Sequence, residues 1–336
     1  MPVTLEPRGT RATPPRTITG RPGPGAGLRI GIINNMPDAA LQSTEAQFCG
    51  LLEGAAGPQR ISVRLSTFPE LPRGAEALER IERDYWPLDE LLAEPLDALI
   101  VTGTEPRAPR LSDEPYWARF GELLAWAERH TVASIWSCLA AHAAVEILDG
   151  IRRQRLPQKR CGVYVHSTLA GHALLAQVAA PLSMPHSRWN ELSLEALRSA
   201  GYTILSWSSA TGADAFVRER GSLMLFFQGH PEYEGTTLLK EYRRDVGRYL
   251  SATQDSYPTL PVGYLSPRAT EILESFKREA LLNRSAEHLE QFPFAAVAAA
   301  LENRWQPAAI GIYRNWLAFI SQAKAASRPA EPVSLA

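Results

Sequence analysis

Cys138 is the residue best placed to act as a nucleophile. It lies between an apolar stretch that we expect to form a strand, residues 132–137, and a stretch with helical spacing, residues 139–148. A cysteine on such a turn would point out of the carboxyl edge of a parallel sheet, where open α/β sheets bind ligands. The helix N-terminus favours the thiolate, and the backbone N–H of Leu139 is a candidate oxyanion-hole donor. A buried structural cysteine is the alternative that position alone leaves open.

A histidine and a glutamate, separated by one residue, follow a later apolar stretch. The segment Gly229-His230-Pro231-Glu232 comes just after residues 223–227, which we expect to form another buried strand. Residues i and i+2 of an extended segment face the same way, so His230 and Glu232 should point together. The glutamate would then fix the tautomer of the imidazole, as in the base and orienting partner of a nucleophilic triad. A polar turn at a strand end is the alternative interpretation of this motif by itself.

Other polar residues form clusters without an obvious structural role. Lys159 precedes a Cys-Gly-Val-Tyr stretch, and Ser187 belongs to a Pro-His-Ser-Arg stretch. Glu241 and Arg244 are three residues apart and therefore lie on one face of an expected helix. Each of these clusters alone is typical of a solvated surface.

Two kinds of site are not indicated by the sequence. It contains neither a Walker-type phosphate loop nor a GxGxxG segment, so a nucleotide-hydrolysing function has no support. His166, His172 and His186 have no acidic or cysteine neighbours at a spacing typical of metal ligands. We therefore expect no metal site.

The composition excludes several classes of protein. The 336-residue chain has 35 Lys and Arg against 36 Asp and Glu, a formal net charge of −1, so it has no global basic field for nucleic acid. No uncharged apolar stretch approaches the roughly 18 residues that a membrane span needs. The three cysteines, of which we interpret Cys49 and Cys161 as structural, are too few and too widely spaced for a disulfide framework or a structural zinc site. A reducing, cytoplasmic location fits this cysteine content best.

Short apolar stretches alternate with stretches of helical spacing through the first two thirds of the chain. We expect strands at residues 28–33, 61–67, 96–101, 132–137, 203–205 and 223–227, and helices at residues 43–53, 117–130 and 139–148. Gly150 suits the C-terminal end of the last of these helices. Such alternation predicts βαβ units, and so an α/β fold with an open, mostly parallel sheet flanked by helices.

The chain divides into four segments by composition. Residues 1–27 are rich in Pro, Gly, Arg and Thr, and we expect a disordered leader. Residues 28–254 form the α/β domain. We expect residues 255–326 to form a helical C-terminal extension that packs on the same domain, with helices at 267–282 and 314–323 and an alanine-rich stretch at 294–301. Residues 327–336 are expected to be a frayed tail.

The motifs in this order resemble the homoserine O-acyltransferases of methionine biosynthesis, in the homoserine O-succinyltransferase family. The resemblance covers residues 28–317 and implies a class I glutamine amidotransferase-like fold with flavodoxin-like layers. The stretches that carry it are Asn35-Met36-Pro37, Glu45-Ala46-Gln47-Phe48, Leu99-Ile100-Val101-Thr102-Gly103, Tyr116-Trp117, Gly162-Val163-Tyr164, His172-Ala173-Leu174-Leu175, Pro185-His186-Ser187-Arg188, Gly229-His230-Pro231-Glu232-Tyr233, Glu241 with Arg244-Asp245-Val246, and Asn315-Trp316-Leu317.

The resemblance implies a ping-pong acyl transfer. By position, Cys138 would take the acyl group from an acyl-CoA as a thioester, with His230 as general base and Glu232 as its orienting partner. The γ-hydroxyl of L-homoserine, activated by His230, would then attack the thioester. The acyl-CoA is a cosubstrate, and no separate cofactor is implied.

The resemblance also assigns the acceptor site and the assembly. Lys159, Ser187 and Arg244 match positions that hold the amino-acid part of the substrate, and Glu241 matches a neighbouring acid. A guanidinium suits a carboxylate because it can bind both oxygens. The implied assembly is a homodimer.

The sequence departs from the family pattern at several positions. Leu139 and His142 stand where the family usually has Trp and Gln. A lysine that normally follows the Asn-x-Met-Pro motif is absent, and residues 38–41 stand there with a two-residue insertion.

The residue that corresponds to the family's choice of acyl donor is Arg107. The family has Gly at this position with succinyl donors and Glu with acetyl donors. A guanidinium could pair with the free carboxylate of a succinyl group, whereas an acetyl group offers no such partner. Succinyl-CoA is therefore the favoured donor over acetyl-CoA, unless Glu105 pairs with Arg107 itself.

Three alternatives stay open on the sequence. Serine or a related hydroxy amino acid could be the acceptor instead of homoserine. The same Cys-His-Glu triad could serve a glutamine amidotransferase or a thioester hydrolase. A degenerate binding or regulatory protein is the non-enzymatic alternative, and the presence of Cys138, His230 and Glu232 argues against it.

Overall fold

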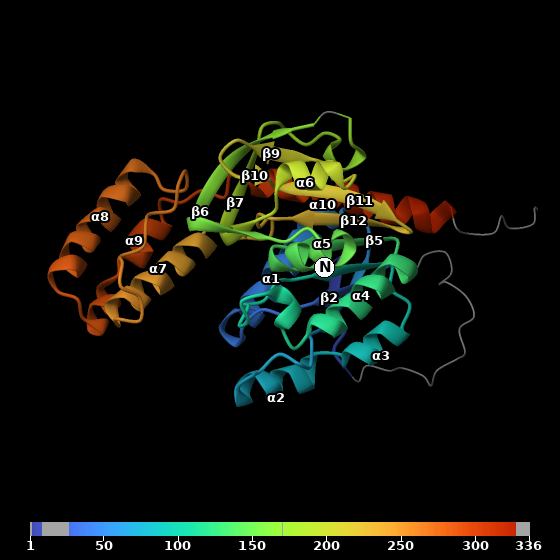
Figure 1. The fold of residues 1–336 in the computed structure, drawn as a ribbon, viewed down its shortest axis with the longest axis horizontal. Coiled ribbons are helices and arrows are strands. Elements are labelled where there is room, and N and C mark those ends of the chain that lie inside the picture. The colour runs from blue at the N-terminus through green and yellow to red at the C-terminus, as the bar shows by residue number, and fades with distance from the viewer. Residues whose placement is uncertain (1, 9–26, 170, 327–336) are drawn as a thin grey trace, which may run out of the picture.

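Two β-sheets form the centre of the molecule (Figure 1). The computed structural model describes residues 2–8, 27–169 and 171–326. The larger sheet has the strand order β1-β3-β2-β4-β5-β12-β11-β8. These strands are β1 (Val3–Leu5), β2 (Leu28–Ile33), β3 (Ile61–Ser66), β4 (Ala98–Val101), β5 (Ala133–Ser137), β8 (Thr203–Ile204), β11 (Ala215–Arg220) and β12 (Ser222–Phe227).

The larger sheet is parallel from β1 to β12, and β11 runs antiparallel between its neighbours β12 and β8. The expected open, mostly parallel sheet is thus confirmed. Ile32 pairs with Ile100, and Ile100 pairs with Ile135, so these side chains share one face of the sheet. Leu99 and Val101 lie on the opposite face, in a separate hydrophobic cluster. Both faces are apolar because helices cover both.

Helices from distant parts of the chain cover the two faces. The cluster on one face includes residues of α1 (Leu41–Ala56) and α10 (Gln306–Ala326). The cluster on the other face includes residues of α3 (Leu88–Ala93), α4 (Trp117–His130), α5 (Leu139–Asp149) and α6 (Leu194–Ser199). The remaining elements of this part are α2 (Ala75–Asp84) and the 3-10 turns η1 (Asp38–Ala40), η2 (Leu111–Asp113) and η3 (Ala173–Leu175).

The smaller sheet is antiparallel and has the order β10-β9-β6-β7. Its strands are β6 (Gln154–Thr168), β7 (Leu182–Glu191), β9 (Ser206–Ser208) and β10 (Gly212–Ala213). No strand was expected at β6 or β7. Their side chains do not alternate cleanly between buried and exposed, so the period-2 signal is weak.

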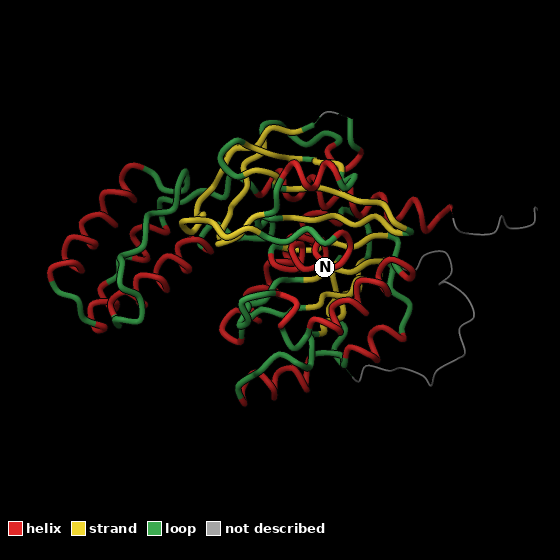
Figure 2. Tube along the Cα trace, viewed as in Figure 1, coloured by secondary structure: helices red, strands yellow, loops and turns green. Residues whose placement is uncertain are grey.

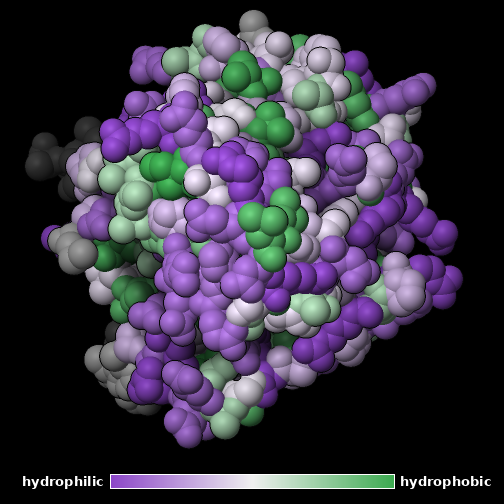
Figure 3. Space-filling view, turned by 90° about the vertical axis from the view of Figure 1, so that its left-hand side faces the viewer, coloured by the Kyte–Doolittle hydropathy of each residue, from purple (hydrophilic) through white to green (hydrophobic). Residues whose placement is uncertain are grey.

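A group of helices forms a lobe at the end of β6 and β7 (Figures 1 and 2). It consists of α7 (Thr237–Leu250), α8 (Pro267–Leu282), η4 (Ala286–Gln291) and α9 (Phe294–Ala298). These elements share one hydrophobic cluster, which also contains Cys161 and Val163 of β6. The cluster therefore crosses the expected boundary at residue 254, whereas α10 packs on the large sheet. The face that includes this lobe is mostly hydrophilic, with its apolar residues in small separate patches (Figure 3).

Local signals place several helix ends where the sequence predicts them. The helix α4 spans Trp117–His130 and α8 spans Pro267–Leu282, as expected. Ser266 caps α8 by accepting the N–H of Ala269, and Gly150 ends α5 in the left-handed conformation with φ 69°. The helix α10 begins eight residues earlier than residue 314.

The expectation of a disordered leader over residues 1–27 is wrong for residues 3–5. These residues form β1, which pairs in parallel with β3 at the edge of the large sheet. The Glu6 carboxylate pairs with Arg64 at 2.9 Å, and the Glu6 carbonyl accepts the indole N–H of Trp86 at 2.8 Å. A short β-prone segment at an open sheet edge gains ladder hydrogen bonds that composition alone does not indicate. Residues 9–26 and the expected tail 327–336 lie outside the described residues. None of the helices in the described part of the chain is long and apolar enough to span a membrane.

Candidate active site

Cys138 lies on a strained turn between β5 and α5. Its backbone has φ 53° and ψ −112°, a conformation that non-glycine residues rarely adopt. Ser137 is the last residue of β5 and pairs with Phe227 of β12 in the parallel sheet. The next residue extends this pairing, because the Cys138 N–H donates to the Phe227 carbonyl at 2.8 Å. The ends of β5 and β12 are thereby held together. The N–H of Leu139 is at the first helical position, where no intrahelical acceptor exists.

His230 and Glu232 point together, as the sequence predicts. The Nδ1 atom of His230 lies 2.8 Å from Glu232 Oε1, and both residues are buried. The His230 N–H donates to the Pro185 carbonyl at 2.8 Å, which anchors the loop on β7. Burial opposes a charge on the imidazole, but Glu232 and the adjacent Cys138 outweigh burial and raise the pKa of His230 well above its usual value. A protonated imidazole beside a cysteine is the arrangement that a cysteine nucleophile with a histidine partner requires.

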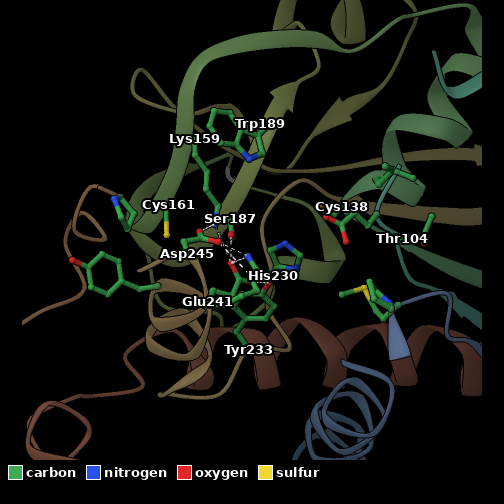
Figure 4. A pocket seen from close by; sticks show the side chains of 18 of the residues that line it. Thr104, Cys138, Lys159, Cys161, Ser187, Trp189, His230, Tyr233, Glu241 and Asp245 are labelled. Carbon is green, nitrogen blue, oxygen red and sulfur yellow. Dashed lines mark hydrogen bonds and ion pairs between the residues drawn. The ribbon is translucent and has the colours of Figure 1, made fainter. Parts of the chain in front are cut away.

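One cavity of about 570 Å³ contains the candidate nucleophile, the His-Glu pair and the polar clusters. His230 lies between Cys138 on one side and a group that includes Ser187, Glu241 and Asp245 on the other (Figure 4). This cavity is also lined by the four residues that are expected to hold the amino-acid substrate. They are Lys159, Ser187, Glu241 and Arg244. They come from β6, β7 and α7, which are far apart in the sequence.

Glu241 is the centre of the polar group. Its carboxylate accepts hydrogen bonds from the Ser187 hydroxyl and, at 2.5 Å, from the Tyr233 hydroxyl. The Lys159 ammonium lies 3.6 Å from Glu241 Oε2 and 2.6 Å from Asp245 Oδ2. Burial raises the pKa of Glu241, but Lys159 and the two hydroxyl donors outweigh burial and lower it overall. The carboxylate is therefore charged at neutral pH.

Arg244 is the most accessible charge of this group. Its side chain is 51% exposed, and its Nη2 lies 3.2 Å from Asp245 Oδ1 and 3.9 Å from Glu241 Oε2. The guanidinium has five donors, so it can bind a ligand carboxylate while it keeps these contacts. Neither Asp245 nor Tyr233 was predicted as a site residue. The available signal for Asp245 was its helical spacing from Glu241, which places both on one face.

Arg107 lines a second cavity of about 520 Å³ and not the one that contains Cys138. The two cavities share the lining residues Pro37, Thr104 and Glu105. Glu105 does not pair with Arg107; it lies 3.7 Å from Arg248. Within the described residues the Arg107 guanidinium has no hydrogen bond or ion pair, although its backbone N–H donates to Glu114 at 2.6 Å. Arg107 is thus an exposed cation beside the candidate site.

Gly103 lies against the candidate oxyanion donor. A Cβ atom at Gly103 would lie 3.0 Å from Leu139 Cβ and 3.1 Å from Leu139 N. Glycine therefore leaves room next to this N–H for an oxygen atom of a ligand.

His166, His186 and Asp214 form a buried cluster that sequence spacing did not reveal. One ligand-type atom of each lies within 4.8 Å of the others. However, Arg188 Nε donates to Nδ1 of His186 at 3.2 Å, so the proton of the neutral imidazole is on Nε2. That proton points toward His166 Nε2 at 3.3 Å and Asp214 Oδ1 at 3.4 Å. The arrangement is typical of a hydrogen-bond network and not of metal ligands.

Comparison with known proteins identifies the family. The family model described as homoserine O-succinyltransferase matches residues 24–326. The chain belongs to the homoserine O-succinyltransferase family. A homoserine O-succinyltransferase of Methylorubrum extorquens is 46% identical over 294 residues, which cover 88% of this chain and 87% of that protein. One of Rhodopseudomonas palustris is 42% identical over 290 residues, which cover 86% of this chain and 87% of that protein.

The fold is also found among solved structures. A GMP synthase component of Thermoplasma acidophilum superposes with a TM-score of 0.50 at 10% identity, covering 90% of this chain and 99% of that one. At this identity the similarity concerns the fold alone. The predicted amidotransferase-like fold and the predicted family are both confirmed.

Proposed function

We propose that the protein transfers a succinyl group from succinyl-CoA to the γ-hydroxyl of L-homoserine, through a thioester on Cys138. The observation that carries the proposal is a single cavity in a member of this family that contains Cys138, the His230–Glu232 pair and the charged group around Glu241. The relatives named above carry the name of this activity. The product is O-succinyl-homoserine, which belongs to methionine biosynthesis.

In the first half-reaction the Cys138 thiolate attacks the thioester carbonyl of the acyl-CoA. The carbonyl oxygen becomes an oxyanion beside the Leu139 N–H, at the position that Gly103 leaves open. The carbon–sulfur bond to CoA then breaks. The His230 imidazolium gives its proton to the leaving CoA thiolate, and the acyl group stays on Cys138.

In the second half-reaction the acceptor hydroxyl attacks the thioester on Cys138. His230, now neutral, takes the hydroxyl proton as the new carbon–oxygen bond forms. Cys138 leaves as the thiolate, which restores the ion pair with the imidazolium. Glu232 holds the Nδ1 proton in both steps, so Nε2 is the atom that exchanges protons.

The group around Glu241 is suited to an α-amino acid. Glu241 and Asp245 offer carboxylate oxygens to an ammonium, and the exposed side of Arg244 offers two donors to a carboxylate. Ser187 and Lys159 hold the acids in place. Such complementary charges fit a zwitterion whose side-chain hydroxyl reaches toward His230.

Arg107 supports a donor with a free carboxylate. Its guanidinium is unpaired within the described residues, and Arg107 lines the second cavity, which adjoins the cavity that contains Cys138. Succinyl-CoA carries such a carboxylate, and acetyl-CoA does not. A charge-assisted pair of this kind contributes about 1.5–3 kcal/mol, which corresponds to roughly 10- to 100-fold in selectivity.

Release of free CoA tests the proposal directly. Succinyl-CoA and acetyl-CoA are each incubated with and without L-homoserine, with Cys138→Ala as the blank. Cys49→Ala is the matched thiol control, because Cys49 lies outside the cavity and burial raises its pKa to about 11. We expect homoserine-dependent release that only Cys138→Ala abolishes.

Each alternative has its own result in the same experiment. An acyl-enzyme that serine discharges better than homoserine would assign a different acceptor. Ammonia released from glutamine, without acyl transfer, would assign an amidotransferase. Acyl-CoA hydrolysis that homoserine does not accelerate would assign a thioester hydrolase. Absence of any acyl adduct on Cys138 would contradict the enzymatic proposals together.

The assembly and the location are part of the proposal. A homodimer is expected, and sedimentation equilibrium of the full chain tests it. A cytoplasmic location is expected for an enzyme that uses acyl-CoA. All three cysteines being free is in keeping with a reducing compartment.

A further inference from the structure

His142 and Gln228 connect the helix that begins after the nucleophile with the loop that carries the base. His142 is one turn into α5, and its backbone N–H donates to the Cys138 carbonyl at 3.2 Å. Gln228 directly follows β12 and precedes His230 by two residues. The Nε2 atom of His142 lies 3.0 Å from Gln228 Oε1, and both side chains are buried.

The other partners of Gln228 fix the direction of this hydrogen bond. Gln228 Oε1 accepts the Leu192 N–H at 2.9 Å and faces Arg188 Nη1 at 3.4 Å. Gln228 Nε2 donates to the Ala213 carbonyl at 2.7 Å. Because Oε1 can only accept, His142 donates through Nε2–H. Burial and the nearby Arg188 guanidinium lower the pKa of His142 to about 3, so the ring is neutral at physiological pH.

We propose that His142 is a positioning residue whose hydrogen bond to Gln228 sets the distance between Cys138 Sγ and the His230 imidazole. The packing of α5 on the large sheet fixes the helix as a whole, and the backbone bond from Cys138 to Phe227 attaches the turn before it to the end of β12. The bond from His142 adds an attachment one turn further along the helix, to the residue that follows β12 and leads into the base loop. A strained turn such as that at Cys138 persists only where its surroundings determine it fully.

The loop is held from its other side as well. Asp214 Oδ1 accepts the Gly229 N–H at 3.1 Å, and the Gln228 N–H donates to the Asp214 carbonyl at 2.9 Å. The base loop is therefore fixed to the sheet, and His142 fixes the nucleophile helix to that loop. The kinetic consequence rests on the proposed function, because a displacement of about 1 Å between reacting groups can cost on the order of 100-fold in rate.

Three substitutions at His142 separate the hydrogen bond from the packing. His142→Leu removes the donor and keeps an apolar side chain of similar bulk. His142→Gln places an amide N–H donor at a reach similar to that of Nε2, whereas His142→Asn is too short to reach Gln228. His288→Leu is the control, because His288 is also buried but lies in η4, where its ring stacks on Phe276 of the helical lobe.

Two measurements report the position of Cys138 relative to His230. The first is the single-turnover rate at which succinyl-CoA acylates Cys138. The second is the pH dependence of iodoacetamide alkylation of Cys138, followed by mass spectrometry of its peptide. Alkylation needs neither CoA nor homoserine, so it tests the positioning role even if the proposed acyl transfer fails.

We expect His142→Leu and His142→Asn to slow acylation by about 10- to 100-fold and to move the alkylation midpoint to higher pH. The KM for homoserine should change less than about twofold. His142→Gln should restore both readouts to within a few-fold of the wild type, and His288→Leu should leave both unchanged. An unaltered alkylation profile in His142→Leu, or in His142→Asn should the first variant not fold, would overturn the proposal. A folded His142→Gln variant as impaired as His142→Leu would overturn it too.

Discussion

The ring of Tyr233 lies stacked on the imidazole of His230, with centroids 4.2 Å apart and planes at 17°. The hydroxyl of the same tyrosine donates to Glu241 Oε1 at 2.5 Å. Tyr233 therefore connects the candidate general base with the acid at the centre of the acceptor site. Its two contacts can be separated, because phenylalanine keeps the ring and removes the hydroxyl.

Tyr233→Phe should weaken acceptor use without affecting acyl transfer to the enzyme. Loss of one hydrogen bond to a charged group costs about 1.5 kcal/mol, so kcat/KM for homoserine should fall roughly tenfold. The rate of Cys138 acylation should stay within about twofold. Tyr264→Phe is the control, because it removes a buried hydroxyl that donates to the Gly235 carbonyl at 2.6 Å outside the cavity. An equal loss in both half-reactions would contradict this assignment of the hydroxyl.

Gly103→Ala should block the oxyanion position. The new Cβ would lie 3.0 Å and 3.1 Å from the Cβ and N atoms of Leu139, so it would occupy the space in front of that N–H. Loss of one oxyanion donor typically lowers kcat about 100- to 1000-fold, and we expect a fall of that order in single-turnover acylation. Gly121→Ala in α4 is the control, because a Cβ there meets nothing closer than 4.0 Å. Near-wild-type acylation in Gly103→Ala would show that the oxyanion binds elsewhere.

Arg107→Glu should shift the donor preference from succinyl-CoA toward acetyl-CoA. The substitution replaces the guanidinium with a charge that repels the succinyl carboxylate. The ratio of kcat/KM for the two donors should fall at least about tenfold. Arg110→Glu controls for the net charge of the loop, because Arg110 is exposed and pairs with Asp113 at 2.9 Å. If the ratio of kcat/KM for the two donors is the same in the wild type and in Arg107→Glu, Arg107 does not contribute to the selection of the acyl group.

Glu232→Gln should change how the stability of the fold depends on pH. Burial lowers the pKa of His230, but Glu232 and Cys138 outweigh it and raise the pKa well above its ordinary value of 6.5. A group whose pKa is higher in the folded than in the unfolded state stabilises the fold. This stabilisation is fully present at a pH below the pKa of the unfolded state, and it is lost as pH rises through the pKa of the folded state. As pH rises above the pKa that His230 has in the unfolded chain, the free energy of unfolding should therefore fall more in the wild type than in Glu232→Gln. Urea unfolding at several pH values measures the difference, which should shrink as pH rises; a constant difference would contradict the coupling.

The positions of the reacting groups could be predicted from the sequence because short-range rules determine them. Cys138 follows a buried strand and precedes a helix, and His230 and Glu232 have the i, i+2 spacing of an extended segment. Parallel strands bring their carboxyl ends to one edge, so the two motifs meet. The same rules do not predict β6 and β7. The antiparallel pairing of these two strands brings Lys159 and Ser187 close to Glu241.

Long-range contacts account for most of what the sequence did not reveal. Asp214 is 28 residues from His186 in the sequence, yet the two are in contact because β7 and the β10–β11 junction meet beside the base loop. The bond between His142 and Gln228 spans 86 residues in the same way. Arg107 was predicted to pair with the acyl donor, and the structure places it in a cavity that adjoins the one with Cys138. A sequence motif specifies a side chain and its neighbours, whereas the cavity it enters depends on how the loops pack.

Deletion of residues 1–8 should destabilise the fold without changing catalysis. The deletion removes β1 from the edge of the large sheet, together with the Glu6–Arg64 ion pair at 2.9 Å and the acceptor of the Trp86 indole N–H. The Arg64 guanidinium and the Trp86 indole N–H would then lose these partners and become more exposed. We therefore expect the free energy of unfolding to fall by about 1–3 kcal/mol. The rate of Cys138 acylation should stay within about twofold, since none of these residues lines the cavity. Glu6→Gln, which keeps β1 and removes only the charge, should cost less than about 1 kcal/mol. Equal stability of the deleted and full-length chains in urea would show that β1 adds nothing to the sheet.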